Sequence, residues 1–181
     1  MRHRPDSDIA GCIAAQARLH ATIAGLTDDD VRGPSLLPDW SVAHVLTHLA
    51  RNADSHVRMV QGAARGDVCW QYGPDQRDRE IEEGSTRGAA ELVADVHGSA
   101  QALEDAWAAL TDDVWAAGES RTNAGTFPIA LQVLRRWREV EFHHADLGLG
   151  FAYADFSPTY VERELSNAAP PPFAGRSDWP G

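Results

Sequence analysis

Three side chains of this sequence have the chemistry and spacing to hold one divalent metal ion. Glu139 and His143 are four residues apart, so on a helix they lie one turn apart on the same face. A third ligand is available at His48, in a second stretch with helical patterning. One carboxylate and two imidazoles give a metal three protein ligands and leave one coordination position open for chemistry. The spacing therefore predicts a three-ligand metal centre of the catalytic type.

Two neighbouring residues leave alternatives open at this centre. His44 lies one turn before His48 on the same face, so it is either a rival ligand or a residue next to the ligands. Asp146 follows His143 by three residues, near the expected end of the helix. Its carboxylate either orients the ring of His143 from behind or finishes the last helical turn.

A second pair of the same residue types lies between and beside the predicted ligands. Glu141 and His144 point about 100–200° away from Glu139 around a helix. They cannot easily join the same site. We expect these two side chains to face solvent or to make contacts between helices.

Composition excludes several classes of protein. The chain has 181 residues, 43% of them apolar, which is enough for one domain with a real core. A net charge of −11 argues against nucleic acid as a partner, and no apolar run is long enough to cross a membrane. Two cysteines, Cys12 and Cys69, give no disulfide framework, and no signal-peptide core follows the N-terminus. We expect a soluble cytoplasmic protein.

Four stretches of about 20 residues carry apolar residues at helical spacing. They are residues 7–25, 42–64, 85–110 and 127–147. Ser41 is a good N-cap for the second stretch, and Pro128 fits the first turn of the fourth. No convincing strand pattern is present, so the sequence predicts an all-α fold, a four-helix bundle whose metal site is built from facing helices.

The bundle is expected to fill residues 1–168 and to include a short helix near residues 158–168. Residues 169–181 are rich in proline and glycine and are expected to form an irregular tail. A long connection at residues 67–84 separates the second and third helices. Loops of this length in a small bundle are often functional.

This connection and the helix before it supply candidates for the rest of an active site. Arg79, with Arg77 as its neighbour in the same charged run, could clamp a substrate carboxylate bidentately, or could simply be solvated. Asn52, one turn after His48, lines the pocket or bonds the next helix. Trp70 and Tyr72 are candidates for a pocket wall that binds a cosubstrate.

Several short motifs, in this order and spacing, resemble a known family. They are DWSV at 39–42, HLARN at 48–52, Tyr72, REIE at 79–82, LTDDVW at 110–115 and REVEFHHADLG at 138–148. Over roughly residues 8–165 the chain resembles the metal-binding domain of the mycothiol-dependent maleylpyruvate isomerase family, within the DinB/YfiT-like helical bundles.

The resemblance implies a ligand set and a cosubstrate. The family's ligands, a histidine in the second helix and a glutamate and histidine four apart in the fourth, match His48, Glu139 and His143. The implied metal is zinc, although relatives use other divalent ions, and the implied thiol is mycothiol or a similar small thiol. Members characterised as isomerases carry a further C-terminal domain with a basic active-site residue. The 181 residues here end soon after the bundle, so substrate specificity transfers less directly than the metal site.

Three functions are compatible with these residues. A thiolate held near a metal could add to the double bond of an electrophilic cis-acid and leave again, giving the trans isomer. The same thiolate could remain attached, which would make the protein an S-transferase. The bundle could also be a non-catalytic module that binds metal or a small molecule, and a homodimer could supply missing pocket walls.

Overall fold

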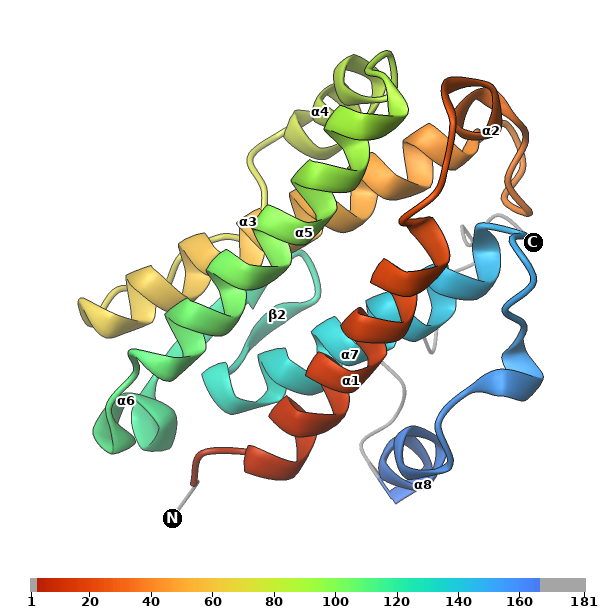
Figure 1. Cartoon of the computed structure of the whole chain (residues 1–181). Helices are drawn as coiled ribbons and strands as arrows, with labels where there is room; N and C mark the ends of the chain where they lie inside the picture. Colours follow the sequence, from red (N-terminus) through yellow and green to blue (C-terminus); the bar gives the residue numbers. More distant parts are fainter. Residues whose placement is uncertain (1–2, 167–181) are drawn as a thin grey trace.

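The computed structural model describes residues 3–166, which form a helical bundle with one small β-hairpin (Figure 1). The long helices are α1 (Asp6–Ile23), α3 (Val42–Ala64), α5 (Ala89–Ala108) and α7 (Ile129–Asp146). The short elements are α2 (Asp28–Arg32), α4 (Gln76–Gly84), α6 (Asp112–Ala117), β1 (Glu119–Thr122), β2 (Gly125–Pro128), the 3₁₀ turn η1 (Tyr153–Asp155) and α8 (Pro158–Ser166). The four long helices confirm the predicted all-α bundle.

The long helices pack in two close pairs, α3 against α5 and α1 against α7, and α3 also contacts α7 (Figure 1). Gly11 allows the α1–α7 pair to approach closely, because a Cβ added there would lie 2.1 Å from the ring of Trp137. The Trp137 ring fills the interface and is buried, as are Leu46 and Leu49 of α3. The α3–α7 contact matters most for function, because it joins the two helices that carry the predicted ligands.

The start of α3 follows from local chemistry at Ser41. The Ser41 hydroxyl accepts a hydrogen bond from the backbone N–H of His44, and the Ser41 N–H donates to Nδ1 of the His44 ring. This reciprocal capping box satisfies donors that a helix N-terminus otherwise leaves unpaired. The predicted N-cap is therefore confirmed, and it fixes where His48 lies along α3.

Two regions differ from the prediction. The connection expected at residues 67–84 contains α4, a nine-residue helix with Ile81 as its buried residue, packed against α3. The region between α6 and α7, expected to lack strands, forms the antiparallel β1–β2 hairpin, in which Ser120 pairs with Phe127. Pro128 ends β2 and is the N-cap of α7 instead of lying in its first turn.

The C-terminal part of the described chain returns along the bundle. Helix α8 ends at Ser166, close to the predicted short helix, and Arg163 on it binds Asp8 of α1 at 2.8 Å. The predicted irregular tail, residues 169–181, lies outside the described residues. Within residues 3–166, no helix combines the length and the apolar character that a membrane span requires.

Candidate metal centre

The structure brings the three predicted ligands together at the α3–α7 contact. His48 Nε2 lies 2.9 Å from Glu139 Oε2, and His143 Nε2 lies 3.4 Å from the same oxygen. The two imidazole rings meet edge to face with their centroids 4.5 Å apart. One ligand atom from each residue lies within 4.8 Å of the other two. We call these three residues the triad.

The triad fits a divalent metal. Its donors are two imidazole nitrogens and one carboxylate oxygen, which suit zinc and similar ions and leave a fourth position open. Among residues 3–166 it is the one group of three or more acidic, histidine or cysteine residues whose ligand atoms converge in this way. His48 is buried, while Glu139 and His143 are half-buried, so the centre is open on one side.

Without a metal, protons hold the triad together. Burial alone would raise the pKa of Glu139, but hydrogen bonds from His143 and His48 outweigh it and hold that pKa well below its usual range. Burial likewise opposes a charge on His143, yet its hydrogen bonds to Asp146 and Glu139 raise its pKa to about 9. The pKa of His48 falls to about 4, through burial and the nearby His143. The metal-free triad therefore contains a carboxylate, an imidazolium and a neutral imidazole.

The ring of His143 is fixed from behind by Asp146. Asp146 Oδ2 lies 2.8 Å from His143 Nδ1, and the Tyr153 hydroxyl donates to Asp146 Oδ1 at 3.1 Å. A carboxylate on the outer nitrogen of a ligand histidine selects its tautomer and aims the other nitrogen at the metal. Of the two alternatives for Asp146, the structure shows the contact with the His143 ring, and the Tyr153 hydroxyl adds one more residue to this series of hydrogen bonds.

Both ring nitrogens of His44 lie next to residues outside the triad. Its Nδ1 takes part in the cap of α3, 2.7 Å from the Ser41 hydroxyl, and its Nε2 lies 3.7 Å from Glu82 of α4. Neither nitrogen belongs to the converging group. The structure therefore places His44 beside the centre and assigns it a structural contact.

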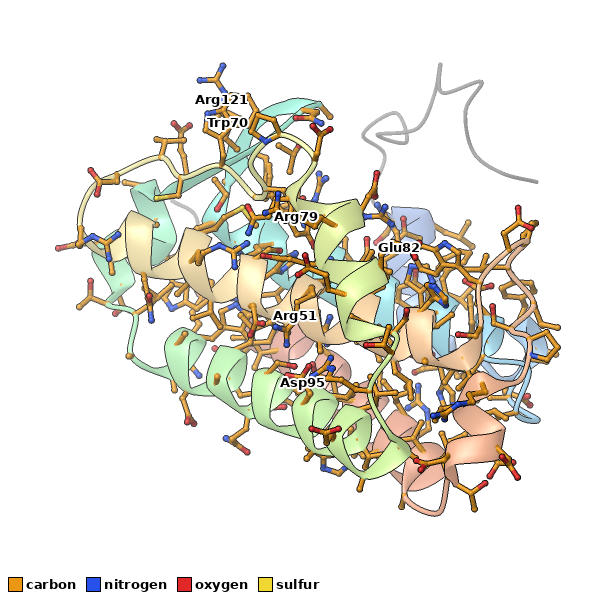
Figure 2. The ribbon with its side chains drawn as sticks, turned by 90° about the horizontal axis from the view of Figure 1, so that it is seen from above. Arg51, Trp70, Arg79, Glu82, Asp95 and Arg121 are labelled. Atoms are coloured by element: carbon orange, nitrogen blue, oxygen red, sulfur yellow. The ribbon has the colours of Figure 1, made fainter. Side chains whose placement is uncertain are left out.

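Trp40 and Arg77 line one edge of the triad. The Trp40 ring lies 5.7 Å from the ring of His48, and the guanidinium of Arg77 lies over the Trp40 ring at 5.6 Å. Arg79, the arginine favoured by the sequence, is exposed on α4 (Figure 2). No contact within the described part of the chain joins Arg79 to the triad. The two arginines are two residues apart and so point about 200° apart around the helix.

Asn52 and Trp70 also lie apart from the ligands. Asn52 is buried and accepts a hydrogen bond from Arg136 Nη1 at 2.9 Å, so it bonds the facing helix α7. Trp70 is half exposed beside the hairpin, where Arg121 of β1 stacks on its ring at 4.4 Å (Figure 2). Tyr72 differs from Trp70, because its hydroxyl is buried and feels the charge of Glu139.

The second Glu–His pair of α7 lies on another face and is buried. Glu141 Oε1 accepts hydrogen bonds from Arg18 of α1 at 2.7 Å and from Trp137 Nε1 at 3.1 Å. His144 Nε2 lies 2.7 Å from the Thr22 hydroxyl. Both residues therefore make contacts between α1 and α7, which was one of the two alternatives predicted for them.

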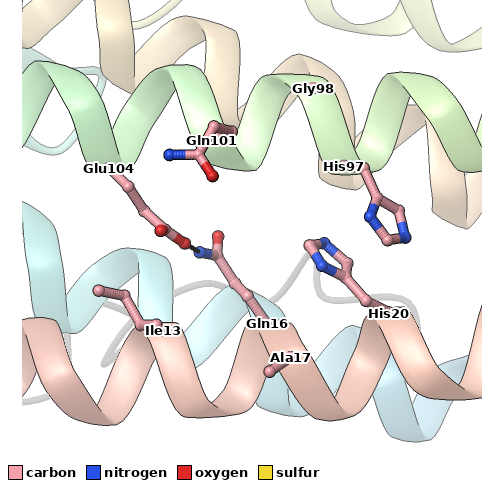
Figure 3. Close-up of a pocket in the computed structure, with 8 residues that line it drawn as sticks. All are labelled: Ile13, Gln16, Ala17, His20, His97, Gly98, Gln101 and Glu104. Atoms are coloured by element: carbon pink, nitrogen blue, oxygen red, sulfur yellow. Dashed lines mark hydrogen bonds between the residues drawn. The ribbon is translucent and has the colours of Figure 1, made fainter.

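A separate cavity of about 440 Å³ lies between α1 and α5 (Figure 3). The rings of His20 and His97 stack across it at 3.7 Å, and Gln16 donates to Glu104 at 2.6 Å. Face-to-face stacking turns the ring nitrogens away from a shared point, and these side chains do not form a converging ligand group. This cavity is not a second metal centre.

Two residues near the triad had no clear sequence signal. Tyr153 is seven residues beyond Asp146, outside the helix, and reaches the site only because the chain turns back at η1. Arg135, whose guanidinium stacks on Phe127 of β2 at 4.4 Å, feels the charge of Glu139. Its contact depends on a hairpin that the sequence pattern did not predict.

The fold and the triad together define a helical-bundle protein with a three-ligand site suited to a divalent metal. Residues 12–148 match the model of the mycothiol maleylpyruvate isomerase N-terminal domain, so the chain belongs to this family. The match confirms the family predicted from the motifs.

Two solved structures share this fold. A crystal structure of the mycothiol-dependent maleylpyruvate isomerase is 25% identical with a TM-score of 0.82, and the match covers 87% of this chain and 66% of that chain. A histidine-to-alanine mutant of that isomerase is 24% identical, with the same TM-score and coverage. The present chain thus spans slightly less than two thirds of the length of these structures. No curated protein sequence matches the chain significantly.

Proposed function

We propose that this protein is a zinc-dependent isomerase that uses mycothiol, or a similar small thiol, to convert an electrophilic cis-acid of the maleylpyruvate type to its trans isomer. The convergence of His48, Glu139 and His143 within 4.8 Å carries the proposal. The family match and the similarity to the solved isomerase support it. The proposed location is the cytoplasm, and the proposed metal-binding bundle comprises residues 1–168.

The chemistry requires a thiolate and an activated double bond. A divalent metal bound at the triad supplies a positive charge that favours the thiolate and polarises a substrate carbonyl. The thiolate sulfur forms a bond to one alkene carbon, and the π electron pair moves onto the conjugated carbonyl. Rotation about the resulting single bond and return of the electron pair expel the thiolate and leave the trans alkene. The reaction consumes neither the thiol nor a proton.

The protein's own residues hold the ligands in place during this cycle. Asp146 keeps Nδ1 of His143 engaged, so Nε2 faces the centre. His48 is held by a helix whose start is fixed at Ser41. The Trp40 ring covers one side of His48, which limits access of water to that ligand.

The decisive experiment measures metal content and turnover together. The full chain is purified without chelator or a metal-binding tag, as wild type, His48→Ala and the control His144→Gln. We expect about one zinc per chain in the wild type and the control, and none in His48→Ala. Isomerisation of maleylpyruvate should require both zinc and mycothiol and should be lost with the metal.

Three other outcomes lead to different conclusions. Thiol that remains covalently attached to the product would identify an S-transferase. Tight binding of zinc or thiol without any turnover would identify a binding module. Full activity of metal-free His48→Ala, with circular dichroism showing an intact fold in every variant, would refute the metal-dependent mechanism.

A further inference from the structure

A fully buried arginine lies three residues before the predicted ligand Glu139 on α7. Arg136 makes three hydrogen bonds, and all three end on neutral oxygens. Its Nη1 donates to the carbonyl of Leu49 at 2.8 Å and to Asn52 Oδ1 at 2.9 Å, and its Nε donates to Gln16 Oε1 at 3.3 Å. Its Nη2 has no hydrogen-bond partner among the residues that the structure describes. Arg136 thus carries a buried charge whose direct partners are all neutral.

Stability does not explain a buried arginine with these partners. Taking a guanidinium out of water is costly, and one unpaired N–H group adds to that cost. Replacing a buried charged network by apolar side chains of similar volume is often neutral or even stabilising. Arg136 is therefore better explained by the arrangement of helices that its hydrogen bonds enforce.

The hydrogen bonds of Arg136 to α3 lie next to the triad. Its two acceptors on α3, Leu49 and Asn52, are the residue after His48 and the residue one turn after it. On α7, Arg136 and Glu139 are three positions apart, which makes them neighbours on the helix surface. These contacts cross the α3–α7 interface within one turn of the point where His48 lies 2.9 Å from Glu139. They fix the spacing and rotation of the two helices where the triad converges.

The same arginine is linked to the other two long helices. Gln16 of α1, which accepts from Arg136, donates from its own Nε2 to Glu104 of α5 at 2.6 Å (Figure 3). The carboxylate of Glu104 is thus two hydrogen bonds from the guanidinium and is the acidic group of this network. Helices α1, α3, α5 and α7 therefore meet in one layer of hydrogen bonds centred on Arg136.

A second buried polar residue of α7 makes similar contacts farther from the triad. Gln132 donates to the backbone carbonyl of His56 of α3 at 3.2 Å and accepts from Trp107 Nε1 of α5 at 3.2 Å. It is as buried as Arg136 and joins α7 to two of the same helices. It precedes Glu139 by seven residues, about one further helical turn than Arg136. Gln132 is therefore a matched control for the effect of a buried polar contact between helices.

We propose that Arg136 is a positioning residue for the metal centre. It holds α3 and α7 at the spacing and rotation that bring the three side chains of the triad together. It acts through its acceptors on α3, since no hydrogen bond joins it to the triad within the described residues. This inference rests on the proposed function, because it concerns the same triad.

The test measures zinc affinity and stability of the full chain side by side, by chelator competition and urea unfolding. The main variant combines Arg136→Met with Asn52→Leu, since removing both partners leaves no buried amide unpaired between them. Its urea midpoint should stay close to that of the wild type, while its zinc affinity should fall at least about tenfold. The control Gln132→Met should lower the urea midpoint and leave zinc affinity unchanged. A fall in both quantities in the main variant would make Arg136 a merely structural residue and overturn the proposal.

A second readout needs no metal. The rings of His48 and His143 lie with their centroids 4.5 Å apart, so their ring protons should give a nuclear Overhauser effect in the metal-free protein. The wild type and Gln132→Met should show this signal, and the main variant should lose it. Loss of the signal in Gln132→Met as well would indicate a general packing effect and overturn the proposal.

Arg136→Lys keeps a buried cation but not the planar fork that reaches several acceptors at once. It therefore tests the proposal if the main variant fails to fold. Zinc affinity and the signal between the two rings should both decline in Arg136→Lys, and no change in either would overturn the proposal.

Separate outcomes distinguish this role from the metal centre itself. If the wild type binds zinc and the main variant binds it equally well with the ring signal intact, the role of Arg136 is wrong and the metal centre stands. If the wild type binds no zinc but the ring signal is lost only in the Arg136 variants, the positioning role stands and the proposed zinc chemistry falls.

Discussion

Helix α7 carries two Glu–His pairs, and the two pairs make different kinds of contact with the neighbouring helices. Glu139 and His143 face α3, where the His48 ring completes a converging set of three side chains that could hold a metal ion. Glu141 and His144 face α1, where Arg18 and Thr22 bind them. The residue types are the same and the spacing differs by one residue. The residues on the facing helix decide whether such a pair becomes a candidate metal centre or a structural contact.

The two pairs differ in the groups that balance the charge of the carboxylate. Glu141 Oε1 takes hydrogen bonds from Arg18 and Trp137, so its charge is balanced by a cation. Glu139 has two imidazoles and no arginine or lysine within ion-pair distance among the described residues. A carboxylate balanced only by protons on imidazoles can exchange those protons for a metal ion. We therefore expect substitutions in the two pairs to affect different properties.

The largest expected effect is on zinc affinity. Glu139→Gln removes the only anionic member of the triad, and we expect zinc affinity to fall by more than about 100-fold. This loss is larger than the one typical for a residue that only hydrogen-bonds a metal ligand. Glu141→Gln should leave zinc affinity unchanged but lower the free energy of unfolding by about 2 kcal/mol, because it uncouples Arg18 from a buried partner. Zinc titration by competition with a chromophoric chelator and urea unfolding measure the two effects. Equal zinc loss in both variants would remove the distinction between the pairs.

The two histidines should titrate in opposite directions in the metal-free protein. Burial opposes a charge on His143, but its hydrogen bonds to Asp146 and Glu139 raise its pKa to about 9, whereas burial and then Arg18 lower the pKa of His144 to about 4. The pKa of both histidines is 6.5 in the unfolded chain. His143 therefore contributes stability that is present below pH 6.5 and is lost as the pH rises through about 9. The contribution of His144 is present above pH 6.5 and is lost as the pH falls toward about 4.

Nuclear magnetic resonance of the ring nitrogens measures these two pKa values directly. His143→Gln and His144→Gln assign the signals. Zinc should abolish the titration of His143 and leave that of His144 in place. Two histidines that titrate together near 6.5 would contradict the contacts described for both.

A smaller effect on zinc affinity is expected at Asp146, which contacts the predicted ligand His143. Asp146→Asn keeps the shape of the side chain but weakens its hold on His143 Nδ1, and we expect zinc affinity to fall by about 10- to 100-fold. Asp155→Asn is the control, since Asp155 lies in the same C-terminal segment and bonds the backbone of Ala152. A loss of the same size in the control would point to a general disturbance of the segment.

The smallest effect is expected at Tyr153. Tyr153→Phe removes the hydroxyl that donates to Asp146 but keeps the ring that packs on Phe142. Because Asp146 still binds His143, zinc affinity should fall by at most about threefold. A larger loss than in Asp146→Asn would mean that Tyr153 acts on the centre by some other route.

Much of the bundle was predictable because its signals are local. The long helices follow from apolar residues at helical spacing, and the start of α3 follows from the Ser41 cap. The pairing of Glu139 with His143 follows from helix geometry alone. The resemblance to the family implies His48, which no local spacing connects to Glu139 and His143.

The missed elements are short and have weak signals of their own. Helix α4 has nine residues with Ile81 as its buried position, so no apolar period is visible. The hairpin has two strands of four residues, and its edge is extended by a bridge between Arg121 and Trp70 of a distant loop. Elements of this size depend on tertiary contacts more than on intrinsic propensity.

The sequence by itself determined the four long helices, the cap of α3 and the one-turn spacing of Glu139 and His143, since each depends on residues within a few positions of one another. Only the tertiary structure decided how closely His48 approaches the predicted pair of Glu139 and His143, and that Arg77 instead of Arg79 lies by the triad. It also decided that Tyr153 reaches Asp146. These choices depend on how helices are rotated against one another, and that rotation is set by packing over the whole core, such as the fit of Trp137 against Gly11.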